Sequence, residues 1–159
     1  MVPFLRYWLP LLIWMALIFS ASADAQSSEH TSRILGPLLR WLWPDISPGR
    51  IEDARTLVRK TAHLTEFAIL AWLWWRALRR PVRRDPRPWS WPAAWFALAA
   101  VALYAVSDEL HQSLVPNRTA SVRDVCIDTL GGAAGLGLLW LWHRWRARRG
   151  EKCSVLSAQ

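Results

Sequence analysis

Cysteine is scarce in this sequence, and internal repeats and nucleic-acid-binding motifs are missing from it. The 159 residues include only two cysteines, Cys126 and Cys153. They are expected at opposite ends of one helix, which is too far apart for a disulfide. The sequence has no internal repeat. It also has no groove-reading motif beside its basic charge, 20 Lys and Arg against 12 Asp and Glu, which argues against nucleic-acid binding.

Apolar residues and tryptophan are abundant instead. The chain is 53% hydrophobic, yet its net charge is +8, a pairing that a soluble domain rarely shows. The charges must therefore be segregated, and basic residues do gather in two blocks, residues 76–87 and 144–152. Several of the 13 tryptophans flank apolar runs, as tryptophan does at membrane interfaces. We expect a single all-α membrane domain over residues 1–159.

Four stretches are predicted to cross the bilayer, at about residues 7–23, 60–79, 88–107 and 124–143. The third is the cleanest, because it holds no charged residue over the roughly 20 positions that a spanning helix needs. The second and fourth reach this length only by including polar and acidic residues. The first also resembles a secretory signal. We expect it to be retained, whereas cleavage after Ala25 would leave three spans.

The orientation follows from the arginines. Five arginines lie in residues 79–89, which link spans two and three, and four more with Lys152 follow Trp142, so both segments are predicted to be cytoplasmic. An even number of spans then places both termini in the cytoplasm and residues 24–60 and 108–123 outside.

The segment between spans one and two is predicted to contain a short interfacial helix. Residues 34–43 are too few to span and are followed by Pro44, so they should lie along the headgroups. Next, Ser47 and Pro48 have the order of an N-cap and a first helical residue. The helix that begins there is expected to run into span two.

Ionisable residues gather at the outer end of span two. Lys60, His63 and Glu66 recur every three residues, which places them on a helical face about 120° wide. His63 and Glu66 lie roughly 4.5 and 9 Å deeper than Lys60. At that depth they need partners or an aqueous cleft.

Polar residues also gather where span three ends. Asp108 and Gln112 share one helical face, with Glu109 beside them. In the connector that follows, Arg118 presents a guanidinium suited to a carboxylate or a phosphate. These residues are expected at the same membrane depth as His63.

Span four begins with two acidic residues. Ser121 and Asp124 have the spacing of a capping box, and capping alone would explain Asp124. Asp128 lies one turn deeper, where capping does not explain it. Beyond it, Gly131 and Gly135 form a GxxxG pair, which favours close helix packing rather than ligand contact.

Two simpler interpretations of this set remain open. The residues could form a ring of ion pairs, with Lys60 and Arg118 facing acids such as Glu109, that only ties helix ends together. His63 and the acids could also suit a divalent ion, but no tight ligand spacing marks a metal site. We therefore predict neither a metal nor a cofactor.

Polar residues on three successive predicted helices keep a fixed order. They are Arg59-Lys60-x-x-His63-x-x-Glu66-Phe67, Tyr104-x-x-x-Asp108-Glu109-x-x-Gln112, Pro116-x-Arg118 and Ser121-x-x-Asp124. Over about residues 55–140 this pattern resembles the VanZ-like family. Three positions depart from it, where the family usually has Gly, Asn and Tyr: Asn117, Asp128 and Phe67.

The resemblance implies a multi-pass protein of the bacterial cytoplasmic membrane with a role in the cell envelope. Resistance to the glycopeptide teicoplanin, for which the family is named, is a less safe implication, because many such proteins occur without a resistance cluster.

The leading functional hypothesis is a site that binds the polar or anionic headgroup of a membrane lipid or envelope precursor. Its predicted binding residues are Lys60, His63, Glu66, Asp108, Glu109, Gln112, Arg118 and Asp124. The alternatives are an enzyme acting on a lipid-linked substrate, with His63, Glu109 and Arg118 as catalytic candidates, a transporter, and a structural protein. No nucleophile is identifiable, which favours a protein that is not an enzyme. No protein partner is indicated.

Overall fold

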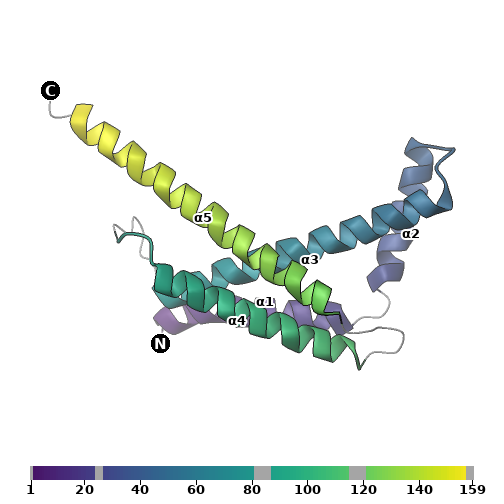
Figure 1. The fold of residues 1–159 in the computed structure, drawn as a ribbon, viewed down its shortest axis with the longest axis horizontal. Helices are drawn as coiled ribbons and strands as arrows, with labels where there is room; N and C mark the ends of the chain where they lie inside the picture. The colour runs from purple at the N-terminus through teal and green to yellow at the C-terminus, as the bar shows by residue number, and fades with distance from the viewer. Residues whose placement is uncertain (1, 24–26, 81–86, 115–120, 157–159) are drawn as a thin grey trace.

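The computed structural model describes residues 2–23, 27–80, 87–114 and 121–156. These residues form five helices and no strand (Figure 1). The helices are α1 (Val2–Ala23), α2 (Ser27–Leu42), α3 (Pro48–Arg79), α4 (Trp91–Gln112) and α5 (Val122–Leu156). The predicted all-α fold is therefore confirmed.

Three helices in the described part are long and apolar enough to cross a membrane. The apolar segments are Phe4–Ser22 of α1, Trp91–Gln112 of α4 and Val122–Arg149 of α5. They coincide with the first, third and fourth predicted spans. Helix α3, which contains predicted span two, is not among them, and its sequence there includes His63, Glu66 and Arg76.

Helix α3 is the centre of the bundle. It packs against all four other helices, and the side chains of Phe67, Leu70 and Ala71 are fully buried at those contacts. Its amino-terminal part runs beyond the bundle beside α2, while the carboxyl-terminal part of α5 projects in the opposite direction (Figure 1). Of the polar residues in predicted span two, His63 and Glu66 are partly buried, whereas Thr61 and Thr65 are exposed.

The start of α3 agrees with the sequence. Ser47 is the N-cap, and its hydroxyl accepts a hydrogen bond from the backbone N–H of Arg50 at 3.4 Å. Pro48 is the first helical residue, a position where its missing N–H is not needed. The helix continues without a break to Arg79, as predicted.

Helices α4 and α2 have boundaries that differ from the predicted ones. Helix α4 begins at Trp91 rather than near residue 88, because Ser90 caps it by accepting from the N–H of Ala93 at 3.4 Å. It also continues to Gln112, so the polar residues at its end are helical. Helix α2 begins at Ser27, earlier than the predicted 34–43, and its placement along the headgroups remains a prediction.

Glycines allow α3 and α5 to pack closely. A Cβ atom at Gly131 would lie 2.5 Å from the carbonyl oxygen of Leu64, and one at Gly135 would lie 2.7 Å from that of Ala68. Both distances are shorter than van der Waals contact, so only glycine fits without moving a backbone. The role predicted for the GxxxG pair is confirmed.

Aromatic and basic residues gather at the end of the bundle where α3 ends and α4 begins. Trp75 and Trp89 stack with ring centroids 5.2 Å apart. Arg76 lies 5.2 Å from the ring of Tyr7 on α1, and Arg144 lies 4.8 Å from the ring of Trp140 on α5. We call this the basic end. Tryptophan with arginine is typical of a membrane–water boundary.

Candidate functional site

The opposite end of the bundle, where α1 and α4 end and α5 begins, holds buried polar residues. Three helices contribute to what we call the carboxylate cluster. Its members are Glu66 on α3, Asp108 and Glu109 on α4, and Asp124 and Asp128 on α5. Asp108, Glu109 and Asp128 are only 1%, 6% and 3% exposed. Ionisable groups at such depth in a membrane helix are rare and usually functional.

Asp108 is the most deeply buried member, and only one of its two carboxylate oxygens accepts hydrogen bonds from the described residues. Its Oδ2 accepts hydrogen bonds from the hydroxyl of Ser22 on α1 at 2.9 Å and from the amide of Gln112 at 2.7 Å. Its Oδ1 is buried and has no hydrogen-bond donor among the described residues. One carboxylate oxygen is thus left to accept from something else.

Glu109 joins α4 to the start of α5. Its Oε2 accepts from the backbone N–H of Ser121 at 2.8 Å. In a capping box that N–H would be accepted by the residue three positions on, Asp124. The capping-box interpretation of Asp124 is therefore wrong, because Glu109 occupies the donor. Asp124 still contributes its charge to the cluster, where it acts on Asp128.

His63 lies between two carboxylates from different helices. Its Nδ1 is 4.0 Å from Oε2 of Glu66 and 3.9 Å from Oδ1 of Asp128. Both distances exceed hydrogen-bond length, and Nδ1 has no hydrogen-bond partner in the described part of the chain. The ring nitrogen is close enough to both acids to bridge them through a ligand or water.

The cluster carries an excess of negative charge. Asp128 interacts electrostatically with the carboxylates of Glu66, Asp108, Glu109 and Asp124, and like charges at this range repel. His63 is the only basic group that pairs with them in the described ranges.

The two predicted cations do not offset this excess in the described structure. Lys60 takes part in none of the ion pairs found among the described residues. Arg118 lies outside those residues, so its part in the cluster remains a prediction. The described helix ends are therefore not joined by ion pairs between Lys60 and the acids, as the ion-pair ring would require. Across the described ranges, no three His, Cys, Asp or Glu side chains are grouped so that they could hold a metal ion.

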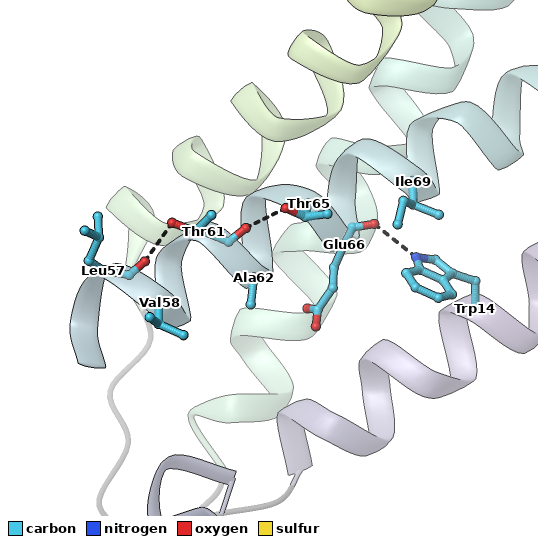
Figure 2. A pocket seen from close by; sticks show the side chains of 8 residues that line it. All are labelled: Trp14, Leu57, Val58, Thr61, Ala62, Thr65, Glu66 and Ile69. Atoms are coloured by element: carbon cyan, nitrogen blue, oxygen red, sulfur yellow. Dashed lines mark hydrogen bonds between the residues drawn. The ribbon is translucent and has the colours of Figure 1, made fainter. Parts of the chain in front are cut away.

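A groove of about 510 Å³ lies on one side of the cluster, between α1 and α3 (Figure 2). Its lining residues are Trp14, Leu57, Val58, Thr61, Ala62, Thr65, Glu66 and Ile69. The indole N–H of Trp14 donates to the backbone carbonyl of Glu66 at 3.0 Å, which links the two helices. Among the predicted binding residues that the structure describes, only Glu66 lines this groove, and it also faces His63 in the cluster.

The structure brings most of the predicted site residues together. His63, the four predicted acids and Gln112 converge through the contacts given above. Sequence reasoning did not include Ser22, Trp14 or Asp128 among the binding residues. Asp128 had a detectable signal, since it lies one turn after Asp124, whereas Ser22 and Trp14 lie in an apolar segment with no polar pattern.

The hydrogen bond from Ser22 to Asp108 should be needed for stability. Replacing Ser22 with alanine removes a hydrogen-bond donor from a buried carboxylate. We expect the free energy of unfolding to fall by about 1–3 kcal/mol. Thermal unfolding in detergent measures the change. Ser20→Ala is the matched control, because the Ser20 hydroxyl is exposed and donates to Ala16 of its own helix. Equal effects of the two substitutions would contradict the prediction.

Comparison with known families agrees with the residue pattern. A family model described as VanZ/LLP1 matches residues 7–143. The match covers most of the chain, from α1 to His143 of α5. Neither the curated proteins nor the solved structures give a match. The fold and the cluster are therefore described from this chain alone.

Proposed function

Since the chain belongs to the VanZ/LLP1 family, we propose that it is a multi-pass protein of the bacterial cytoplasmic membrane that binds a lipid or envelope headgroup in its carboxylate cluster. The ligand is a membrane lipid or a lipid-linked envelope precursor. The proposal concerns an envelope role, and glycopeptide resistance is not part of it.

The observation that supports binding is the unsatisfied state of buried carboxylates. Oδ1 of Asp108 has no donor among the described residues, and in that part of the chain His63 is the only basic group that pairs with Asp128. Burying an ionised carboxylate without partners costs several kcal/mol or more. A headgroup that supplies hydrogen-bond donors would offset that cost, so the cluster is suited to binding.

The depth of the cluster suits a headgroup. Asp128 precedes Arg144 by 16 positions on α5, which corresponds to about 24 Å along the helix. The hydrocarbon core is about 30 Å thick. If the basic end marks one boundary, the cluster is within about 6 Å of the other. Headgroups reach that depth without crossing the membrane.

We further propose that α3 also crosses the membrane, as span two of four, and that the basic end faces the cytoplasm. Within predicted span two, His63 lies beside Asp128 of α5 and Glu66 beside Trp14 of α1, so the low hydropathy of α3 does not prevent it from spanning. With four spans, a fluorescent protein fused after Gln159 should fluoresce, and alkaline phosphatase fused after Leu114 should be active. The reverse pattern would overturn this orientation.

A binding role has more support than catalysis. Of the hydroxyl groups near the cluster, those of Ser107 and Ser113 donate to carbonyls of their own helix, and both residues are exposed. His63 is too far from either acid to be oriented by a hydrogen bond. The described residues thus supply neither an activated nucleophile nor a positioned base.

The test compares lipid retention in variants of the cluster. Asp108→Asn and His63→Ala should each lower the amount of co-purified lipid, measured by native mass spectrometry, by about tenfold. Glu52→Gln is the control, because it removes an acid from the exposed surface of the same α3.

Product analysis of the same samples separates binding from catalysis. Lipid loss in both variants without any turnover by the wild type supports binding. Turnover that His63→Ala abolishes while lipid is retained would instead establish an enzyme. Unchanged retention in both variants would overturn the proposal.

A further inference from the structure

We propose that the groove between α1 and α3 binds the ammonium group of a membrane lipid, with Glu66 and Trp14 as its recognition residues. This inference rests on the proposed function and names the chemical class of the headgroup. The apolar part of the lipid next to its headgroup would contact the groove, and the ammonium would face the carboxylate of Glu66.

Glu66 and Trp14 form the two parts of an ammonium site. Trp14 is held in place by the hydrogen bond from its indole N–H to the Glu66 carbonyl, 3.0 Å long. The Glu66 carboxylate projects from α3 toward α1, on the side of the helix where Trp14 lies (Figure 2). An aromatic face beside a carboxylate is a favourable place for a substituted ammonium ion.

The hydrogen-bond donors of the groove are already used, which disfavours an anion. The hydroxyl of Thr61 donates to the carbonyl of Leu57, and that of Thr65 donates to the carbonyl of Thr61, each at 2.8 Å (Figure 2). The Trp14 N–H is also engaged. A phosphate would find no free side-chain donor on this lining, whereas an ammonium would find an acceptor in Glu66.

The charge around the groove agrees with a cation. Glu66 acts on Asp128 together with the other cluster acids, so the field at the inner edge of the groove is negative. Arg59 lies two turns from Glu66 on the same side of α3, but it is exposed and does not line the groove. Among the described residues, the lining itself contains no cation.

The remaining lining is suited to a hydrocarbon chain. Leu57, Val58, Ala62 and Ile69 supply apolar walls over about 18 Å of α3. The volume of about 510 Å³ lies within the range of roughly 300–1,000 Å³ in which small ligands bind. Leu57 and Val58 on this lining are exposed, so the groove is open at the surface of the described structure.

Three lipids with identical dioleoyl chains test the inference by native mass spectrometry of the full-length protein in detergent. Phosphatidylethanolamine has ammonium and phosphate, phosphatidylglycerol has phosphate only, and a diacyl trimethylammonium propane has ammonium only. The wild type should retain the two ammonium lipids about tenfold better than phosphatidylglycerol. Glu66→Gln and Trp14→Leu should remove this preference, while Glu52→Gln should keep it. If Trp14→Leu fails to fold, Trp14→Phe should fold and keep part of the preference, because the ring remains.

The outcomes distinguish this inference from the proposed function. Equal retention of all three lipids, lost in Asp108→Asn but not in Glu66→Gln, would support headgroup binding in the cluster. The same result would overturn the ammonium inference. Ammonium preference lost in Glu66→Gln but unaffected by Asp108→Asn would support the groove and contradict headgroup binding at the buried acids of the cluster. A dimer that Glu66→Gln dissociates, with no lipid preference, would show that a second copy fills the groove and would overturn the inference.

Discussion

Replacing Gly131 with alanine should lower the unfolding temperature of the purified protein by roughly 2–12 °C. The added Cβ would lie 2.5 Å from the carbonyl oxygen of Leu64 and 3.0 Å from its Cα. Because these are backbone atoms, no side-chain rotation relieves the clash, and α5 must move away from α3. Overpacking of this kind costs typically 1–3 kcal/mol.

The same substitution six positions later provides the control. Gly137 lies on α5, and a Cβ there would have no neighbour within 4 Å. Gly137→Ala should be neutral or stabilise the helix by up to about 1 kcal/mol, since alanine is the better helix former. Scanning fluorimetry in one detergent compares the two variants. If Gly131→Ala is as stable as Gly137→Ala, the close packing of α3 and α5 is not essential.

Movement of α5 should also affect the site. Asp128 lies one turn before Gly131 on the same helix, and its distance of 3.9 Å from His63 depends on how closely α3 and α5 pack. We therefore expect Gly131→Ala to reduce lipid retention even in the fraction that remains folded. Gly137→Ala should retain lipid as the wild type does.

Sequence patterns predicted the features of this fold that depend on neighbouring residues. Ser47 and Pro48 marked the start of α3, and the glycine pair marked its packing with α5, because both signals are local. The start of α4 was placed too early since residues 88–90 are uncharged, although they are not helical and Ser90 caps the helix. An uncharged run predicts where a chain is apolar, and a cap decides where it becomes helical.

The contacts that build the site could be predicted only in part. The spacing of His63, Glu66, Asp108 and Gln112 indicated which helical faces would meet. The bond between Ser22 and Asp108 joins residues 86 positions apart, and that between Trp14 and Glu66 joins residues 52 apart. Such pairs depend on how α1 packs against α3 and α4, and α1 has no polar periodicity to indicate its buried face.

Replacing Asp128 with asparagine should stabilise the ligand-free protein while weakening its binding of lipid. Asp128 is 3% exposed and interacts with four other carboxylates, so both desolvation and repulsion oppose its ionisation. Asparagine has nearly the same shape and carries no charge. We expect a gain on the order of 1–3 kcal/mol, measured as a higher unfolding temperature, together with a fall in lipid retention. Such an exchange of stability for function is common at binding sites.

Asp53→Asn is the control for this prediction, because Asp53 is exposed on the outer part of α3, away from the cluster, and its neutralisation should change neither quantity. A lower unfolding temperature for Asp128→Asn would mean that a cation outside the described residues, such as Arg118, holds the Asp128 carboxylate in the folded protein. In that case the excess of negative charge would not exist, and the argument for an ammonium ligand would lose its electrostatic support. Higher stability with weaker binding would show instead that the protein tolerates a destabilising acid because the ligand needs it.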